Sequence, residues 1–145
     1  MIIKIKYRSD ETKRIEFVGG IETSNWIDLS TDEGVQLKKG EDKLINLGVA
    51  MELPKGYEAH VVPRSSTFKN YKIILANHHG VIDSSYNGDE DWWKFWAIAM
   101  EDTFIPTGSR ICQFRIEKVQ PEITFYEVEL LGNKNRGGHG EGTGV

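Results

Sequence analysis

The sequence has a single cysteine, Cys112, among its 145 residues. One cysteine cannot form a disulfide within the chain, and no group of cysteines and histidines has the spacing of a zinc site. Because free cysteine behaves as a small apolar residue, we expect Cys112 to be a buried strand residue. Neither disulfides nor structural zinc are therefore expected to hold this fold together.

Long apolar runs are also missing. No run approaches the roughly 18 residues that a helix needs to span a bilayer. The first residues, Met1–Tyr7, alternate apolar and charged side chains. This pattern is typical of a strand and unlike the basic and apolar regions of a signal peptide. We therefore expect no association with a membrane and a cytoplasmic location.

Positive charge is scarcer than negative charge. The chain has 18 Lys and Arg against 22 Asp and Glu, a formal net charge of −4. Proteins that hold nucleic-acid polymers are usually basic, because they must neutralise many phosphates. An acidic chain that binds phosphate does so locally, so the composition favours a small phosphorylated ligand over a polymer.

Helical patterns are nearly absent, since one or two turns over Ser65–Asn70 are the only candidate. Short strand-like stretches recur instead, separated by turns rich in Gly, Pro and Asn. The length fits a single domain, and we predict an all-β sandwich or barrel. The predicted strands are Ile2–Tyr7, Trp26–Leu29, Val35–Leu37, Lys43–Ala50, Tyr57–Val62, Ile73–Ala76, Lys94–Met100, Ser109–Glu117 and Glu122–Leu130.

The C-terminal segment is rich in glycine: residues 136–145 read Arg-Gly-Gly-His-Gly-Glu-Gly-Thr-Gly-Val. Such a segment cannot hold one conformation by itself. One interpretation is a frayed terminus. The other is an arm in which Arg136 and unobstructed backbone N–H groups close on an anion. We predict a β domain at residues 1–132 and a flexible arm at residues 133–145.

Three segments contain candidate functional residues. Pro63-Arg64-Ser65-Ser66-Thr67 combines an arginine with hydroxyls and suits an anion, although such serines often only cap a helix. Gly80–Gly88 ends an apolar stretch with Asp83, before the hairpin signal Asn87-Gly88. Asp83 could position a water or sugar hydroxyl, or simply bond its own turn. Arg110 and Gln113, three positions apart in one strand, should point to opposite faces.

Taken together and in this order, these segments resemble the motifs of one family, the trimeric dUTPases. The second to fifth motifs are matched by the segments 63–66, 80–89, 110–113 and 136–138, and Ile27-Asp28-Leu29 resembles the first. The resemblance spans nearly the whole chain from Ile27 onward. It implies a jelly-roll-like β fold and a homotrimer that exchanges C-terminal arms between subunits. Each of its three sites would lie at a subunit interface, with the hairpin from one chain, the Arg-Ser-Ser turn from another and the arm from the third.

The resemblance implies an enzyme that hydrolyses dUTP to dUMP and pyrophosphate, which keeps uracil out of DNA and supplies dUMP for dTMP synthesis. Asp83 would be the base that orients a water for attack on the α-phosphorus. Mg²⁺ would bridge the phosphates and contact Asp28 only through water. Tyr86 would lie against the deoxyribose and exclude a 2′-hydroxyl.

The family's other binding residues also have counterparts in this sequence. Asn77 and the backbone of Gly80, Val81 and Ile82 would read uracil. The phosphates would be held by Arg64, Ser65, Ser66 and Gln113, and by the arm residues Arg136, Gly137 and Gly138.

The sequence departs from the family in the first and fifth motifs. Asn25-Trp26-Ile27 replaces the usual Ala-Gly-Tyr, and Glu141 or His139 stands where the family has the phenylalanine that covers uracil. An aromatic residue after the third motif, Trp92 or Trp93, is an alternative lid. These residues could equally fill the core or a subunit interface.

Two other functional classes remain open. A dCTP deaminase shares the fold and an Arg-Ser-Ser turn, but it would need a glutamate placed for deamination and usually has tryptophan in place of Tyr86. A non-catalytic β-trimer that serves as a binding module would explain the altered motifs. The presence of Asp83, Tyr86 and Asn77 argues against the latter.

Overall fold

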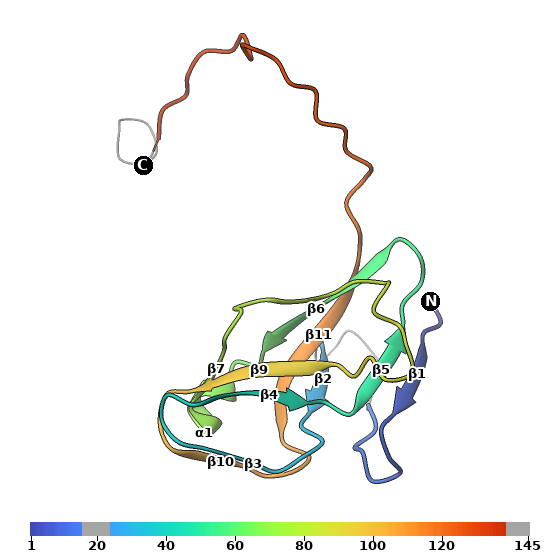
Figure 1. Ribbon diagram of the computed structural model, residues 1–145, viewed down its shortest axis with the longest axis vertical. Helices are drawn as coiled ribbons and strands as arrows, with labels where there is room; N and C mark the ends of the chain where they lie inside the picture. The colour runs from blue at the N-terminus through green and yellow to red at the C-terminus, as the bar shows by residue number, and fades with distance from the viewer. Residues whose placement is uncertain (16–23, 139–145) are drawn as a thin grey trace.

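The computed structural model describes residues 1–15 and 24–138. Within these residues almost all regular structure is strand (Figure 1), and the prediction of an all-β fold is confirmed. The elements in chain order are β1 (Lys4–Tyr7), β2 (Ile27–Ser30), β3 (Val35–Leu37), β4 (Asp42–Asn46), β5 (Val49–Glu52), β6 (Tyr57–Pro63), α1 (Thr67–Tyr71), β7 (Ile73–Leu75), β8 (Gly80–Ile82), β9 (Lys94–Ala99), β10 (Thr103–Ile105) and β11 (Arg110–Lys118).

The described strands form small antiparallel sheets in the orders β2-β11-β6-β8, β4-β9-β7, β1-β5 and β10-β3. Alternating side chains of these sheets meet in one apolar core. Phe95, Ile45 and Ile111 are fully buried there, and Trp93 packs edge-to-face on Phe114 with a centroid distance of 5.2 Å. Burial of these large side chains is the main stabilising contribution.

The predicted strand Lys43–Ala50 is two strands, β4 and β5, in different sheets. The break falls at Gly48, whose φ is +71°. A Cβ there would lie 2.6 Å from Thr12 and 2.7 Å from Asp32. Glycine is therefore required both for the backbone conformation and for the close approach.

The predicted strand Glu122–Leu130 does not form in the single chain, so this prediction is wrong. After β11 ends at Lys118, residues 119–138 form no strand or helix. Figure 1 shows them as a long arm, coloured orange to red, that runs clear of the sheets. In the described ranges, no helix is long and apolar enough to cross a membrane.

Candidate functional site

A tight turn connects β6 to α1 and carries Arg64, Ser65 and Ser66. The turn is anchored by Thr67, the first residue of α1, which is completely buried. The Thr67 hydroxyl accepts the backbone N–H of Arg64 at 2.9 Å and donates to the carbonyl of Ile111 at 2.7 Å. This one side chain therefore fastens the Arg-Ser-Ser turn to strand β11.

The serines of this turn are not engaged as helix caps. Ser66 is the N-cap of α1 but makes no side-chain capping bond, and its hydroxyl lies 3.4 Å from an Arg64 guanidinium nitrogen. Ser65 is exposed. Both hydroxyls can therefore bond a ligand without uncapping the helix.

Arg64 faces the aspartate of the first motif. Its Nε lies 3.1 Å from Oδ1 of Asp28, and Arg110 lies 3.8 Å from the other carboxylate oxygen. Asp28 is directly opposite Gln113 in the β2–β11 pairing, so both side chains are on one face of the sheet. Gln113 is half-buried and donates to the carbonyl of Pro63 at 3.3 Å. Residues from three distant segments thus form one polar cluster.

The expectation that Arg110 and Gln113 point to opposite faces is wrong. The β2–β11 register shifts between Arg110 and Cys112, and the consecutive residues Ile111 and Cys112 are both buried. A β-bulge of this kind inserts one residue and resets the alternation. Arg110 therefore reaches Asp28 on the face that carries Gln113.

Cys112 lies directly beneath this cluster and is completely buried, as expected from the sequence. Burial raises the pKa of its thiol strongly, and the negative charge of Asp28 raises it further, while Arg64 lowers it. The thiol therefore stays protonated and serves as a small apolar residue under the cluster.

The segment of the third motif lies along the other edge of the same sheet. Strand β8 pairs with β6, with Gly80 opposite Val61 and Ile82 opposite Ala59. A side chain at Gly80 would come within 3.2 Å of the Val61 carbonyl, so glycine permits this close pairing. Asp83 follows β8 and is exposed.

The hairpin expected at Asn87-Gly88 does not form between neighbouring strands, because β8 pairs with β6 instead. The N–H of Gly88 donates to Asp91 at 2.7 Å, and the N–H of Asp91 returns to the Gly88 carbonyl at 3.1 Å. These bonds close a loop rather than a two-residue hairpin.

Tyr86 is fixed within this loop. Its N–H donates to the carbonyl of Asp83 at 3.0 Å, and its hydroxyl donates to the carbonyl of Trp92 at 3.1 Å. Partial burial raises the pKa of the Tyr86 hydroxyl, and Asp91 raises it further. The neutral ring is thereby held at both ends beside Asp83.

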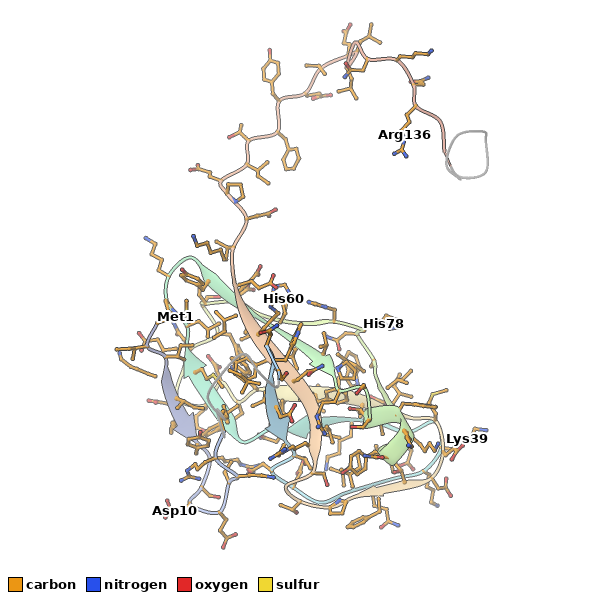
Figure 2. The ribbon with its side chains drawn as sticks, turned by 180° about the vertical axis from the view of Figure 1, so that it is seen from behind. Met1, Asp10, Lys39, His60, His78 and Arg136 are labelled. Carbon is orange, nitrogen blue, oxygen red and sulfur yellow. The ribbon has the colours of Figure 1, made fainter. Side chains whose placement is uncertain are left out.

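Within one chain the two halves of the predicted site lie apart. Because β8 runs antiparallel to β6, Asp83 lies beyond Ala59, whereas Arg64 follows β6 at its opposite end. Ala59 and Arg64 are five residues apart, which corresponds to about 16 Å of extended strand. Figure 2 shows Arg136 on the arm, away from the body of strands. Gly137 and Gly138 follow it in the chain.

Of the lid candidates, Trp93 is wrong: its side chain is 0% exposed and packs in the core. Alternation along the strand places Phe95 inside with it. Trp92 is half-buried beside Tyr86, bonds Glu90 through its indole N–H at 3.1 Å, and lies under Lys6. Glu141 and His139 lie outside the described residues.

Sequence reasoning missed the role of Thr67 and underestimated Arg110. A threonine three positions after the arginine of a Pro-Arg-Ser-Ser turn is a signal for a hydroxyl that bonds the turn's backbone. The position of Arg110 depends on a bulge, for which the local sequence carries no comparable signal.

Comparisons with known proteins agree with this geometry. The family model for dUTPase matches residues 20–144. The chain is 57% identical over 140 residues to the SPbeta prophage-derived deoxyuridine 5′-triphosphate nucleotidohydrolase YosS of Bacillus subtilis (strain 168), covering 97% of this chain and 96% of that protein.

Two solved structures have a similar fold. A variant dUTPase of the Staphylococcus bacteriophage 80alpha, determined with dUpNHpp, has a TM-score of 0.75 at 19% identity, covering 91% of this chain and 99% of that one. A variant dUTPase of phage phi11 of S. aureus, described with a structural Mg(II) ion, has a TM-score of 0.74 at 19% identity, covering 90% and 99%. From its family model, its sequence relatives and its fold, the chain is identified as a member of the dUTPase family.

Proposed function

We propose that this chain hydrolyses dUTP to dUMP and pyrophosphate. The observation that carries the proposal is the cluster of Arg64, Ser65, Ser66 and Gln113 in a member of the dUTPase family. Guanidinium, hydroxyl and amide groups on one surface suit a chain of phosphates. The name of the Bacillus relative and the dUTP analogue bound to the 80alpha enzyme support this substrate.

In the proposed reaction, Asp83 accepts a proton from a water that attacks the α-phosphorus. The bond from that phosphorus to its bridging oxygen breaks, and pyrophosphate leaves. Asp83 suits the role because it is an exposed carboxylate fixed at the end of β8. Tyr86, held at its backbone and hydroxyl, would pack on the deoxyribose, and Asn77 with the backbone of β8 would read uracil.

Magnesium fits as a partner of the triphosphate rather than as an ion held by protein alone. Among the described residues, no group of three or more His, Cys, Asp and Glu is arranged to hold a metal. Asp28 is a single carboxylate already balanced by two arginines. Mg²⁺ keeps most of its waters, so one carboxylate acting through water is a suitable partner. When bound, the ion would neutralise charge on the phosphates.

The separation of Asp83 from Arg64 supports sites shared between subunits. A general base must be within hydrogen-bond reach of the attacking water, and about 16 Å of strand is far too long for one chain to supply both groups. The loop of one copy would therefore face the Arg-Ser-Ser turn of a second copy.

The arm supports the same assembly. Several of its apolar side chains are almost fully exposed within one chain, with Phe125 at 93%, Tyr126 at 87% and Leu130 at 85%. So much exposed apolar surface in one segment is typical of a surface that another subunit covers. We propose a homotrimer in which each arm, with Arg136, Gly137 and Gly138, crosses to a neighbour. The division between domain and arm at residues 132 and 133 belongs to this proposal, as does a cytoplasmic location.

The experiment that tests the proposed function measures pyrophosphate and ammonia released from dUTP, dCTP and UTP with magnesium. Pyrophosphate from dUTP alone is the expected result. Ammonia from dCTP would identify a deaminase, and the absence of any turnover would favour a binding module.

Asp83→Asn should lower kcat by 10²- to 10⁴-fold, the usual cost of losing a general base. Asp89→Asn, an exposed carboxylate of the same loop, is the matched control. An Asp83→Asn enzyme with more than about a tenth of the normal kcat would disprove the assignment.

A further inference from the structure

Two histidines that the proposed reaction does not use are in direct contact. Nδ1 of His60 lies 2.6 Å from Nε2 of His79, with the rings edge-to-face at a centroid distance of 4.8 Å and an angle of 74°. His60 belongs to β6, and His79 immediately precedes β8. The contact therefore joins the turn between β7 and β8 to the central sheet.

That turn and strand β8, which follows it, carry the groups proposed to read uracil. His79 stands between Asn77 and Gly80, and its backbone N–H donates to the Asn77 carbonyl at 2.6 Å. Asn77 and His79 are exposed, so little packing fixes the turn. Strand β8 itself is fixed, because His60 is opposite Val81 and Gly80 packs closely on Val61. The imidazole contact is thus the side-chain tether of the turn.

We infer that His60 is a positioning residue for the uracil site. Through His79 it holds the turn that carries Asn77 beside β8. This inference rests on the proposed function for the role of Asn77, but the tether itself can be measured without substrate. Figure 2 shows His60 near the end of the body from which the arm leaves. His60 lies on β6, four residues before Arg64, which follows the end of that strand. Loss of the His60 side chain should therefore affect recognition of uracil rather than of the phosphates.

The contact has a definite hydrogen-bonding requirement. A hydrogen bond between two imidazoles needs one N–H and one bare nitrogen, which His60 and His79 supply to each other across the 2.6 Å contact. A replacement at either position keeps the tether only if it can still donate or accept this bond.

The charged groups around the pair do not replace this contact. Nε2 of His60 lies 3.3 Å from Glu58 on β6, outside hydrogen-bond geometry, and 3.9 Å from Glu117 on β11. Arg115 on β11 pairs with Glu117 at 3.0 Å. These groups face the side of His60 away from His79, and the neighbouring His78 is exposed. They contact His60 without holding the turn.

Replacements at His79 test the inference. His79→Gln keeps an N–H near the position of Nε2, whereas His79→Ala removes the tether. At pH 8, His79→Ala should raise the KM for dUTP about three- to tenfold over that of the wild type, the effect of losing one hydrogen bond. His79→Gln should keep the KM of the wild type. The kcat of each variant should change less than its KM.

The control is His78→Asn, next to the tether. His78 has a φ of +60°, which asparagine tolerates, so this variant removes an exposed imidazole without straining the turn. It should have the KM of the wild type. An unchanged KM in His79→Ala, or an equal rise of KM in His79→Ala and His78→Asn, would overturn the inference.

A second measurement does not depend on turnover. At pH 8, amide hydrogen exchange should show lower protection of turn residues 77–79 in His60→Ala and His79→Ala than in the wild type, while the protection of Gly80–Ile82 in β8 should not change. The double variant should lose no more than either single one, because both remove the same contact. Unchanged protection would overturn the inference, whereas lost protection in a protein without dUTP turnover would support the tether and reject only the proposed function.

Discussion

Asp28 on β2 forms an ion pair of 3.1 Å with Arg64, in the turn after β6, at the centre of the predicted phosphate site. The carboxylate also lies 3.8 Å from Arg110. In the absence of phosphates, Asp28 therefore balances the two guanidinium groups. A bound triphosphate brings its own negative charge, which would release the carboxylate for a hydrated magnesium ion.

This relationship gives the first prediction, for Asp28→Asn. The fold should persist, because a half-exposed ion pair contributes little stability. The magnesium concentration for half-maximal activity should rise several-fold, while binding of dUpNHpp without magnesium should not weaken, since the cluster becomes more positive. The measurements are activity against magnesium concentration and calorimetric titration.

Glu52→Gln is the matched control for Asp28→Asn. It also removes one negative charge and one ion pair, the 2.9 Å contact with Lys4, on sheet β1-β5. It should leave the magnesium requirement unchanged. An unchanged requirement in Asp28→Asn as well would contradict the assigned role of Asp28.

The second prediction concerns Thr67, which joins the Arg-Ser-Ser turn to β11. Thr67→Val keeps the shape of the side chain but leaves the Ile111 carbonyl and the Arg64 N–H without this partner. Unpaired buried groups typically cost about 1–3 kcal/mol each, so urea unfolding should shift to lower concentration. The KM for dUTP should also rise, because the turn loses its attachment.

Thr31→Val separates the two effects. Thr31 is also buried and bonds the backbone of Glu33 at 2.6 Å, but it does not contact the Arg-Ser-Ser turn. It should lose stability without a change in KM. If both variants raised KM equally, the rise would reflect general destabilisation rather than the position of the turn.

Much of this fold was predictable because alternation and turn residues are local signals. Val35–Leu37 was predicted with the observed bounds, and β6, β9 and β11 within one residue at each end. The failures share one physical cause: a strand also needs a partner. Glu122–Leu130 has strand-like residues but no partner strand in its own chain, and the bulge beside Arg110 depends on how β2 and β11 pair. Alternation identifies the faces of a strand and not its neighbours.

The same limit applies to the candidate site. Motif order alone identified Arg64, Ser66 and Gln113, and the fold brings them to one surface. The resemblance implied that Asp83 and the Arg-Ser-Ser turn of one site come from different subunits. The distance between them within one chain depends on the direction of β8, which motif order alone does not give.

The third prediction concerns the remaining aromatic lid candidate, Trp92. Its backbone carbonyl accepts the Tyr86 hydroxyl, so Trp92 adjoins the proposed sugar site. If it stacks on uracil, Trp92→Ala should weaken dUpNHpp binding by about 1–3 kcal/mol, the usual range for base stacking on an aromatic ring. Trp96→Ala is the control, because Trp96 is also partly exposed but bonds Asp42 on the β4-β9-β7 sheet. Equal binding by the wild type and Trp92→Ala would exclude Trp92 as the lid.

The last prediction concerns the arm. Phe125 is 93% exposed in the single chain, and covering such a side chain with a neighbouring subunit contributes about 1.5–3 kcal/mol. Phe125→Ser should therefore raise the protein concentration needed for assembly by about tenfold or more. Phe104→Ser is the matched control, since Phe104 is 62% exposed on β10 of the body. Sedimentation velocity over a dilution series should show a trimer for the wild type and the control, and dissociation of Phe125→Ser at higher concentration.

Truncation after Asn135 tests the other part of the arm. It should leave the trimer intact but lower kcat/KM severely, because it removes Arg136 and the glycines and keeps Phe125. A wild-type monomer that is active at nanomolar concentration would overturn both the exchange of arms and the shared site.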